Sequence, residues 1–287
     1  TRNKSKKNLY RLKRLNILDD IIVIEGISLD QQFLKKLLKK YSKTKEIYYL
    51  AGDSSATDSF IYPHKSFESN TTGILNILLN IKRFNNRIKV FYAASGQFYG
   101  NNKNNYFSEN SEIRPTTPYA VAKAAGYWLI KIFRENYNLY ACSGILFNHE
   151  SPLRNNQFVT KKIINTSKLM IKNKKLKLKL GDINIYRDWG WTAEYVEAMW
   201  LMLQQKKPKD LIIGSGNKNS LKEFVKEVFK LLKIKKDRLE YNKKNLKRIN
   251  DIKSYKANIR LTKKVLNWQP KIGLKKIVYK LVNDQLY

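Results

Sequence analysis

The chain has 287 residues, 43% of them hydrophobic, which is enough for one large core or for a large and a small domain. No apolar run reaches the roughly 18 residues of a membrane span, and the basic N-terminus lacks the apolar segment of a secretory signal. The net charge of +34 comes from Lys residues spread along the whole chain among Asn and Ile, as in the product of an AT-rich coding sequence, so we expect no nucleic-acid partner. The single cysteine, Cys142, excludes an internal disulfide, reads as a buried small hydrophobe, and fits a reducing cytoplasm.

Apolar runs alternate with amphipathic stretches over the first half of the chain. Short apolar runs predict buried strands, and apolar residues at helical spacing predict the helices between them. In chain order we predict a strand over 20–26, a helix over 29–41, a strand over 46–52, a helix over 69–84, a strand over 87–95, a helix over 117–136 and a strand over 139–148. This alternation predicts an α/β fold, a doubly wound parallel sheet with helices on both faces.

The pattern changes after about residue 148. There we predict a helix over 158–171, a short strand over 176–181, a helix over 193–205, a short strand over 210–216, and helices over 221–232, 261–267 and 274–282. This second part is smaller and mixed, and we expect it to cap the ligand crevice of the sheet. We therefore predict a sheet portion over 1–148 and a cap portion over 149–287, with some segments of the latter returning to the sheet.

Tyr119 and Lys123 form a Y-x-x-x-K pair in the predicted helix 117–136. This spacing puts both side chains on one face. An ammonium close to a phenol favours the phenolate, which can take a proton from a sugar hydroxyl while hydride leaves the same carbon. Alone the pair is a weak signal, because most such pairs decorate a helix surface. Ser95 strengthens it by ending a predicted strand, since ligands bind at the carboxyl ends of parallel strands in this architecture.

Four stretches then carry a resemblance to a known family. They are AASGQFYG (93–100), TPYAVAKAAGYW (117–128), YACSGILFNHESPLRNNQFVTKKI (140–163) and YRDWGWTAEYVEAMWLMLQQ (186–205). Together they resemble the GDP-mannose 4,6-dehydratases and their relatives, including the GDP-heptose 4,6-dehydratases, within the extended short-chain dehydrogenase/reductases. The resemblance covers essentially the whole chain, and its N-H-E-S-P and R-D-W-G runs are specific. It implies a Rossmann-like cofactor-binding portion, a substrate-binding cap, NADP as cofactor and a cytoplasmic enzyme.

The resemblance also assigns roles to individual residues. It implies catalytic roles for Ser95, Gln97, Tyr119 and Lys123; cofactor contacts for Arg2, Leu50, Ala51, Ser54, Tyr119, Lys123, His149 and Arg154; and substrate contacts for Asn148, Lys162, Arg187 and Arg248. Arginine suits the phosphate contacts because its rigid fork pairs with phosphate oxygens. Two alternatives stay open: a packed turn histidine for His149, and a helix-start ion pair with Asp188 for Arg187. No metal site is predicted.

The sequence departs from the family in three places. No G-x-G-x-x-G turn occurs, and the chain begins about where the first βα unit of the family ends, so we expect roughly 30 residues to be missing. Ile27 stands where the family usually has an Asp that contacts adenine. Gln97 stands where the dehydratases carry a glutamate that moves the C5 proton and assists the leaving C6 hydroxyl. A carboxamide is a very poor base, so we expect crippled dehydration and surviving hydride transfer at C4.

The implied reaction converts GDP-mannose or GDP-manno-heptose to its 4-keto-6-deoxy sugar for polysaccharide biosynthesis. Hydride leaves C4 to NADP, the C5 proton is removed, water leaves from C6, and hydride returns to C6. The resemblance also implies a homo-oligomer, a dimer or a tetramer, with no membrane partner. Two alternatives remain: a C4 reductase or epimerase of a nucleotide sugar, and a catalytically impaired, truncated paralogue that binds without turnover. A nucleic-acid-binding protein rests on the charge alone.

Overall fold

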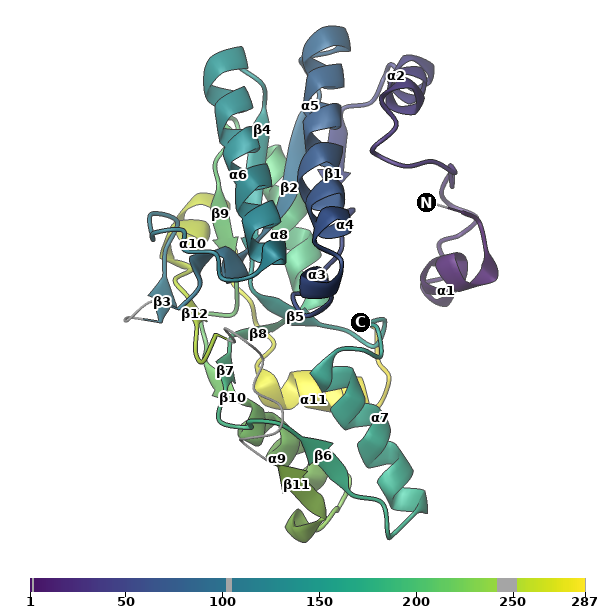
Figure 1. Cartoon of the computed structure of the whole chain (residues 1–287), viewed down its shortest axis with the longest axis vertical. Coiled ribbons are helices and arrows are strands. Elements are labelled where there is room, and N and C mark those ends of the chain that lie inside the picture. Colours follow the sequence, from purple (N-terminus) through teal and green to yellow (C-terminus); the bar gives the residue numbers. More distant parts are fainter. Residues whose placement is uncertain (2, 102–104, 242–251, 287) are drawn as a thin grey trace. The chain divides into compact units, whose positions relative to one another are not determined.

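The computed structural model describes residues 1, 3–101, 105–241 and 252–286. Its central sheet has the strand order β1-β2-β4-β9 (Figure 1). These strands are β1 (Glu46–Tyr49), β2 (Lys89–Ser95), β4 (Ala141–Leu146) and β9 (Leu211–Ile213). β1 pairs in parallel with β2, and β4 pairs in parallel with β9. The predicted α/β sheet is therefore confirmed, with each strand somewhat shorter than its apolar run.

Helices join the strands, as the alternation predicted. They are α1 (Lys6–Arg14), α2 (Gln31–Lys40), α3 (Asp58–Ile61), α4 (Pro63–Phe67), α5 (Gly73–Phe84), α6 (Pro118–Tyr137), α7 (Val159–Lys172), α8 (Thr192–Gln204), α9 (Leu221–Leu231), α10 (Arg260–Leu266) and α11 (Leu274–Val282). A π-helical turn, Glu68–Thr72, joins α4 to α5, and two 3-10 turns span Gly96–Tyr99 and Lys236–Arg238. α5 and α6 lie side by side (Figure 1).

The remaining strands are short and pair two by two. They are β3 (Tyr106–Phe107), β5 (Asn148–Glu150), β6 (Leu178–Leu180), β7 (Tyr186–Arg187), β8 (Trp189–Trp191), β10 (Asn219–Ser220), β11 (Leu239–Tyr241) and β12 (Lys256–Ala257). β12 pairs in parallel with β3, β5 with β8, and β11 with β6, whereas β10 and β7 are antiparallel. All of these strands except β3 lie in the part of the chain after residue 147, for which a mixed composition was predicted.

Local chemistry explains where α6 begins and how closely it approaches the sheet. The Thr117 side chain accepts a hydrogen bond from the backbone N–H of Ala120, and Pro118 occupies the first turn, where it sacrifices no helical bond. Gly126 faces β2, and a side chain at that position would collide with the hydroxyl of Tyr92. The helix can therefore lie tight against β2, which places Tyr119 and Lys123 on a buried face.

The chain forms two compact units that are interleaved along the sequence. The first contains 1–94, 117–143 and 202–209, and the second contains 95–116, 144–201 and 210–287. In the first unit the buried core includes Ile74 and Leu78 of α5 and Phe91 of β2. In the second unit the tryptophans of β8 pack among apolar residues of α7, α9 and α11. The division into 1–148 and 149–287 stays a prediction.

The strand predicted over 20–26 was wrong. These residues form no strand, and Ile21 and Ile22 are exposed. Apolar character alone does not make a strand, because the backbone groups also need a neighbouring strand as hydrogen-bond partner. In this segment Gly26 N–H donates to the Thr1 carbonyl at 2.8 Å, and the Thr1 ammonium donates to the Ile24 carbonyl at 2.9 Å.

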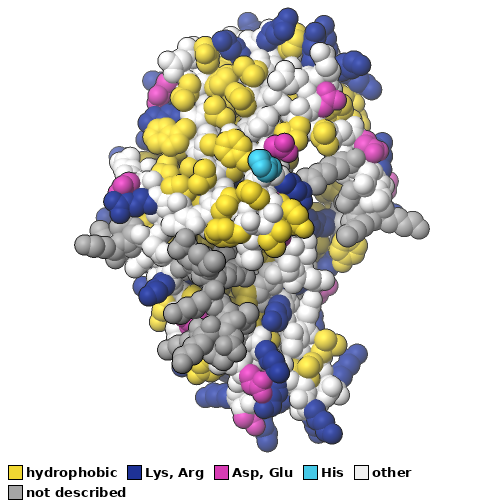
Figure 2. Space-filling model, viewed as in Figure 1, with side chains coloured by type: hydrophobic (Ala, Val, Ile, Leu, Met, Phe, Trp, Pro, Cys, Tyr) yellow, Lys and Arg dark blue, Asp and Glu magenta, His cyan; other side chains and the backbone are white. Residues whose placement is uncertain are grey.

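The surface carries its positive charge in a dispersed form. Figure 2 shows Lys and Arg side chains scattered over the visible face, with apolar side chains gathered in its upper part. In the first unit, the exposed apolar residues of α3 to α6 include Phe60, Ile61, Phe67, Trp128 and Ile132. None of the described helices is long and apolar enough to cross a membrane.

Candidate active site

Lys123 lies at the centre of the candidate site in the first unit. Its Nζ donates a hydrogen bond of 2.7 Å to the carbonyl of Ala93 in β2. The same ammonium lies 5.1 Å from the ring centroid of Tyr92 and 5.9 Å from that of Tyr119, within cation–π range of both. Lys123 and Tyr119 are each only 7% exposed. The structure therefore brings the predicted tyrosine and lysine together on the buried face of α6.

Burial sets the protonation of this lysine. Desolvation lowers the pKa of Lys123 from 10.5 to about 7. A buried ammonium is disfavoured because it loses its hydration, and here one carbonyl and two aromatic faces replace the water only in part. A lysine poised near neutral pH beside a phenol is an arrangement typical of functional sites.

Tyr119 is held at its backbone as well as by burial. Its N–H donates to Ser59 Oγ at 3.1 Å, and the Ser59 hydroxyl donates to the carbonyl of Ala56 at 2.7 Å. Ser59 thus ties the first turn of α6 to the segment that follows β1. Because Ser59 lies 60 positions before Tyr119, the helical pattern gave no signal of this contact.

The segment after β1 carries the predicted cofactor contacts Leu50, Ala51 and Ser54, all of which are exposed. Leu50 presents an apolar side chain that is 56% exposed. Gly52 has φ +142, a conformation that favours glycine, and a side chain there would collide with Asn70. The Asn70 side-chain amide donates to the carbonyl of Asp53 at 3.1 Å and so fixes the segment.

Ser95 and Gln97 belong to the second unit. Ser95 ends β2, two residues after Ala93, and its Oγ accepts a hydrogen bond from the N–H of Gln97 at 3.3 Å. Ser95 is buried, and Gln97 is half-buried in the 3-10 turn that follows. The predicted hydroxyl therefore stands at the carboxyl end of a central strand, with the carboxamide one turn away.

Tyr255 brings two predicted substrate residues of the second unit together. Its hydroxyl donates to Asn148 Oδ1, and the guanidinium of Arg187 lies 5.3 Å from its ring centroid. Tyr255 is buried, while Asn148 and Arg187 are half-buried. Tyr255 could not be predicted as part of this group, since 107 positions separate it from Asn148 and no spacing signal joins them.

His149 and Arg154 form a second group in this unit. The His149 imidazole Nδ1 lies 2.9 Å from the Phe147 carbonyl, and Arg154 Nη1 donates to the His149 carbonyl at 2.7 Å. Arg154 Nε also lies 3.2 Å from the carboxylate of buried Glu150. Burial, with a smaller effect of Arg154, lowers the pKa of His149 to about 4. The imidazole is therefore neutral at pH 7.

Asp188 has a different partner from the one considered in the sequence analysis. It is fully buried, and its carboxylate accepts backbone N–H groups from Ser215 at 2.7 Å, Gly216 at 2.9 Å and Ala257 at 3.1 Å. Burial raises the pKa of Asp188 to about 6, although these N–H groups act against the rise. Its role is therefore to join three chain segments beside Arg187.

Other predicted residues are exposed or not described. Lys162 lies exposed on α7, where its Nζ donates to the Lys179 carbonyl at 3.0 Å. Ile27, at the position of the adenine-contacting Asp, is 47% exposed. Arg2 and Arg248 lie outside the described residues.

The sheet, with a buried tyrosine and lysine on the helix beside it, defines a Rossmann-like protein of the epimerase/dehydratase class. A dTDP-glucose 4,6-dehydratase from Bacillus anthracis, solved with NAD, has a TM-score of 0.83 at 19% identity, covering 96% of this chain and 83% of that one. A UDP-glucose 4-epimerase from Thermotoga maritima also has a TM-score of 0.83, at 18% identity, covering 94% and 86%. These similarities establish the fold.

The family follows from the sequence comparison. The GDP-mannose 4,6 dehydratase family model matches residues 1–281. GDP-mannose 4,6 dehydratase 1 of Arabidopsis thaliana is 37% identical over 85% of this chain and 68% of its own length. The Dictyostelium discoideum enzyme is 38% identical over 79% and 65%, and the human enzyme 31% over 96% and 79%. The chain belongs to the GDP-mannose 4,6-dehydratase family and spans about two thirds of the first two of these relatives.

Proposed function

We propose that this protein binds a GDP-sugar, GDP-mannose or GDP-manno-heptose, and oxidises its C4 hydroxyl with NADP as cofactor. The buried Lys123 ammonium beside the Tyr119 ring carries the proposal. A cation in that place favours a phenolate, and a phenolate can accept the proton of a sugar hydroxyl. Family membership supports the choice of a GDP-sugar.

The residues after β1 fit one part of a dinucleotide. Exposed Leu50 offers an apolar surface at the carboxyl end of a parallel strand, where ligands of this fold bind. We assign Leu50, Ala51 and Ser54, together with Arg2, His149 and Arg154, to the cofactor. The sequence holds no glycine-rich turn for the pyrophosphate, so we assign no residue to that contact. When bound, NADP supplies the hydride acceptor.

The protein's own residues would divide the work of oxidation among them. Lys123 stabilises the Tyr119 phenolate, which takes the C4 hydroxyl proton and becomes a neutral phenol as hydride leaves C4 for NADP. The Ser95 hydroxyl hydrogen-bonds the sugar oxygen. On the substrate side, Tyr255 orients the Asn148 amide toward the sugar. Arg187, Lys162 and Arg248 supply positive charge for the diphosphate and nucleoside.

Gln97 favours a second candidate function that keeps the chemistry at C4 and lacks the dehydration step: a C4 reductase or epimerase of a nucleotide sugar. The 4,6-dehydration needs a group that removes the C5 proton, and a carboxamide cannot do this near neutral pH. We therefore propose that oxidation at C4 proceeds and that loss of water from C6 is slow. General acid–base help is worth roughly 10²- to 10⁴-fold, which sets the size of the expected deficit.

The exposed apolar residues of α3 to α6 support a homo-oligomer, a dimer or a tetramer. Phe60, Phe67 and Trp128 each expose about half of their surface to solvent, and contiguous apolar surface in a soluble protein marks an interaction site. Sedimentation velocity tests this assembly, and a monomer at micromolar concentration would contradict it.

Single-turnover oxidation tests the proposed chemistry. The protein is mixed with GDP-mannose and NADP, and NADPH is followed by its absorbance. Wild type should form NADPH, and Tyr119→Phe should form it at least 100-fold more slowly, as expected for loss of general base catalysis. Tyr137→Phe is the matched control, because Tyr137 lies on the same helix with an exposed side chain. Equal rates for Tyr119→Phe and wild type would rule out the assigned base.

A further inference from the structure

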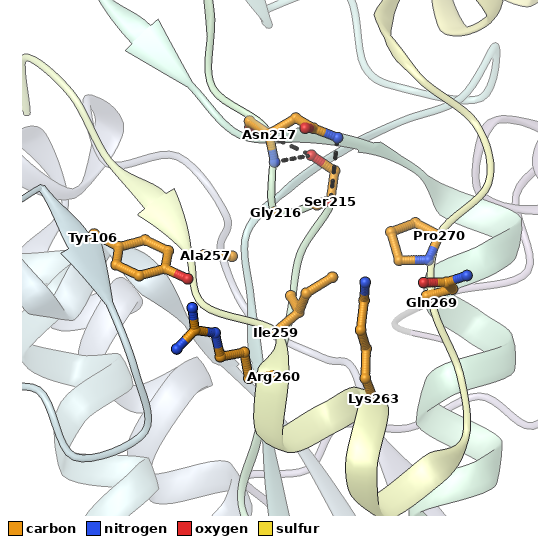
Figure 3. A pocket seen from close by; sticks show the side chains of 10 residues that line it. All are labelled: Tyr106, Ser215, Gly216, Asn217, Ala257, Ile259, Arg260, Lys263, Gln269 and Pro270. Atoms are coloured by element: carbon orange, nitrogen blue, oxygen red, sulfur yellow. Dashed lines mark hydrogen bonds between the residues drawn. The ribbon is translucent and has the colours of Figure 1, made fainter.

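A pocket of the second unit lies among residues that have no role in the proposed oxidation. It encloses about 310 Å³ and is lined from four segments, by residues that include Tyr106, Ser215, Arg260, Lys263 and Gln269 (Figure 3). This volume is at the lower end of the range found for small-molecule sites. A small ligand would fit in this volume.

The pocket is lined by cations without acidic residues. Arg260 and Lys263 lie three positions apart on α10 and both line the pocket; Figure 3 shows the Arg260 side chain directed toward Tyr106 and the Lys263 side chain on the other side of Ile259. No Asp or Glu is among the lining residues, and neither cation is paired with a carboxylate in the described part of the chain. Lys256, 5.3 Å from the ring centroid of Tyr106, adds positive charge beside the wall.

Each wall of the pocket is fixed by contacts outside it. The strand pairing of β12 with β3 places Tyr106 opposite Lys256. Thr262 of α10 donates its hydroxyl to the Ile212 carbonyl at 2.5 Å. On the other side, the Glu194 carboxylate accepts the Lys271 N–H at 2.6 Å, next to Gln269 and Pro270. A pocket built in this way is preorganised, so little ordering is needed when a ligand binds.

Three lining residues of the pocket also bind a buried carboxylate. Ser215, Gly216 and Ala257 donate their backbone N–H groups to the buried carboxylate of Asp188. These three N–H groups stabilise the Asp188 carboxylate, which has no exposed surface. Asn217 is held by Ser215, whose Oγ accepts its N–H at 3.1 Å. An anion in the pocket meets two cations, a phenol hydroxyl and a side-chain amide.

We infer that this pocket binds a small phosphate monoester, such as a sugar phosphate, at a site separate from the residues assigned to the GDP-sugar. A phosphate monoester carries about −1.5 to −2 charges at pH 7, which matches the two cations. Its oxygens accept from the guanidinium, the ammonium and the Tyr106 hydroxyl, which are charge-assisted or polar donors. The volume leaves room for the organic part beside Ile259 and Pro270.

Isothermal titration of the full chain with glucose 1-phosphate tests the inference, at an ionic strength of about 0.15 M to screen dispersed charge. We expect saturable binding by wild type, weakened at least tenfold by Arg260→Gln or Lys263→Gln, since each removes a charge-assisted bond. Lys264→Gln is the matched control: it is the next residue of α10, exposed and outside the pocket, with the same change of charge. It should alter affinity less than twofold.

Several outcomes would overturn the inference. Equal weakening by all three substitutions would mean that dispersed charge, and not the pocket, attracts the ligand. Competition by GDP-mannose would mean that the pocket belongs to the GDP-sugar site. If inorganic phosphate bound as tightly as glucose 1-phosphate, the organic part of the ligand would contribute nothing to binding. If wild type bound neither, the pocket would not be a phosphate site. Tyr106→Phe, which deletes one hydroxyl on an exposed ring, gives an independent reading and should weaken binding several-fold.

Discussion

Replacing Lys123 with methionine should abolish oxidation and yet stabilise the protein at neutral pH. The ordinary pKa of a lysine side chain is 10.5, and burial lowers the pKa of Lys123 to about 7 in the folded protein. Each pKa unit corresponds to 1.36 kcal/mol, so keeping Lys123 charged in the folded state costs about 5 kcal/mol. Loss of the bond to the Ala93 carbonyl offsets about 1–3 kcal/mol of the gain. The net stabilisation at pH 7 is therefore about 2–4 kcal/mol.

The sign of the pH dependence follows from the direction of the shift. Between about pH 7 and pH 10.5 the unfolded chain holds a proton on Lys123 that the folded chain has released, so wild-type stability rises with pH. The gain in folding stability from the release of this proton is complete above pH 10.5, and it is lost as the pH falls to about 7. Between pH 7 and pH 9 it amounts to about 2 kcal/mol, and Lys123→Met lacks it.

Urea unfolding at pH 7, 8 and 9 measures this difference. The stability advantage of Lys123→Met over wild type should shrink by about 2 kcal/mol from pH 7 to pH 9. Lys131→Met, on the same helix but outside the fully buried set, should show no such change. An advantage of Lys123→Met that stays constant across this range would refute the argument that burial lowers the pKa of Lys123.

Three further substitutions test other parts of the account. Gln97→Glu should raise the rate of water loss from C6 by roughly 10²- to 10⁴-fold in a mass-spectrometric assay, and an unchanged rate would show that position 97 does not serve the C5 proton. Asp188→Asn should lower the free energy of unfolding by about 3 kcal/mol, because an amide cannot accept all three N–H groups. As a control in the same urea titration, Asp182→Asn at an exposed position should change the free energy of unfolding by less than about 0.5 kcal/mol. Tyr255→Phe should raise KM for the GDP-sugar about tenfold with little change in kcat, and an unchanged KM would show that Asn148 needs no such partner.

Periodicity predicted most of the fold because it depends on local pattern. The helix at 117–136 has a threonine cap, a first-turn proline and a continuous apolar stripe, and it forms over Pro118–Tyr137. The run at 20–26 is also apolar, yet it forms no strand. A strand needs a neighbouring strand as hydrogen-bond partner, and that partner comes from another part of the chain. Local sequence pattern therefore predicts a helix, whereas a strand also depends on pairing with a second strand.

In the candidate site too, the residues related by local spacing were predictable and those joined by long-range contacts were not. Tyr119 and Lys123 were predictable because helical spacing alone places them on one face. Tyr255 and Ser59 were not, since each contacts its partner across a long stretch of chain. Asp188 had a visible signal in R-D-W-G, but the neighbouring arginine suggested an ion pair. The carboxylate instead binds backbone N–H groups, which no sequence pattern displays.

Isotope transfer from C4 tests the central claim most directly. The protein is incubated with NADP and GDP-mannose that carries deuterium at C4, and the nicotinamide and sugar are analysed by mass spectrometry. The account predicts deuterium on the reduced nicotinamide and a sugar that largely retains its C6 hydroxyl. Binding of GDP-mannose without transfer of deuterium would contradict it and would identify a protein that binds the sugar nucleotide without turnover.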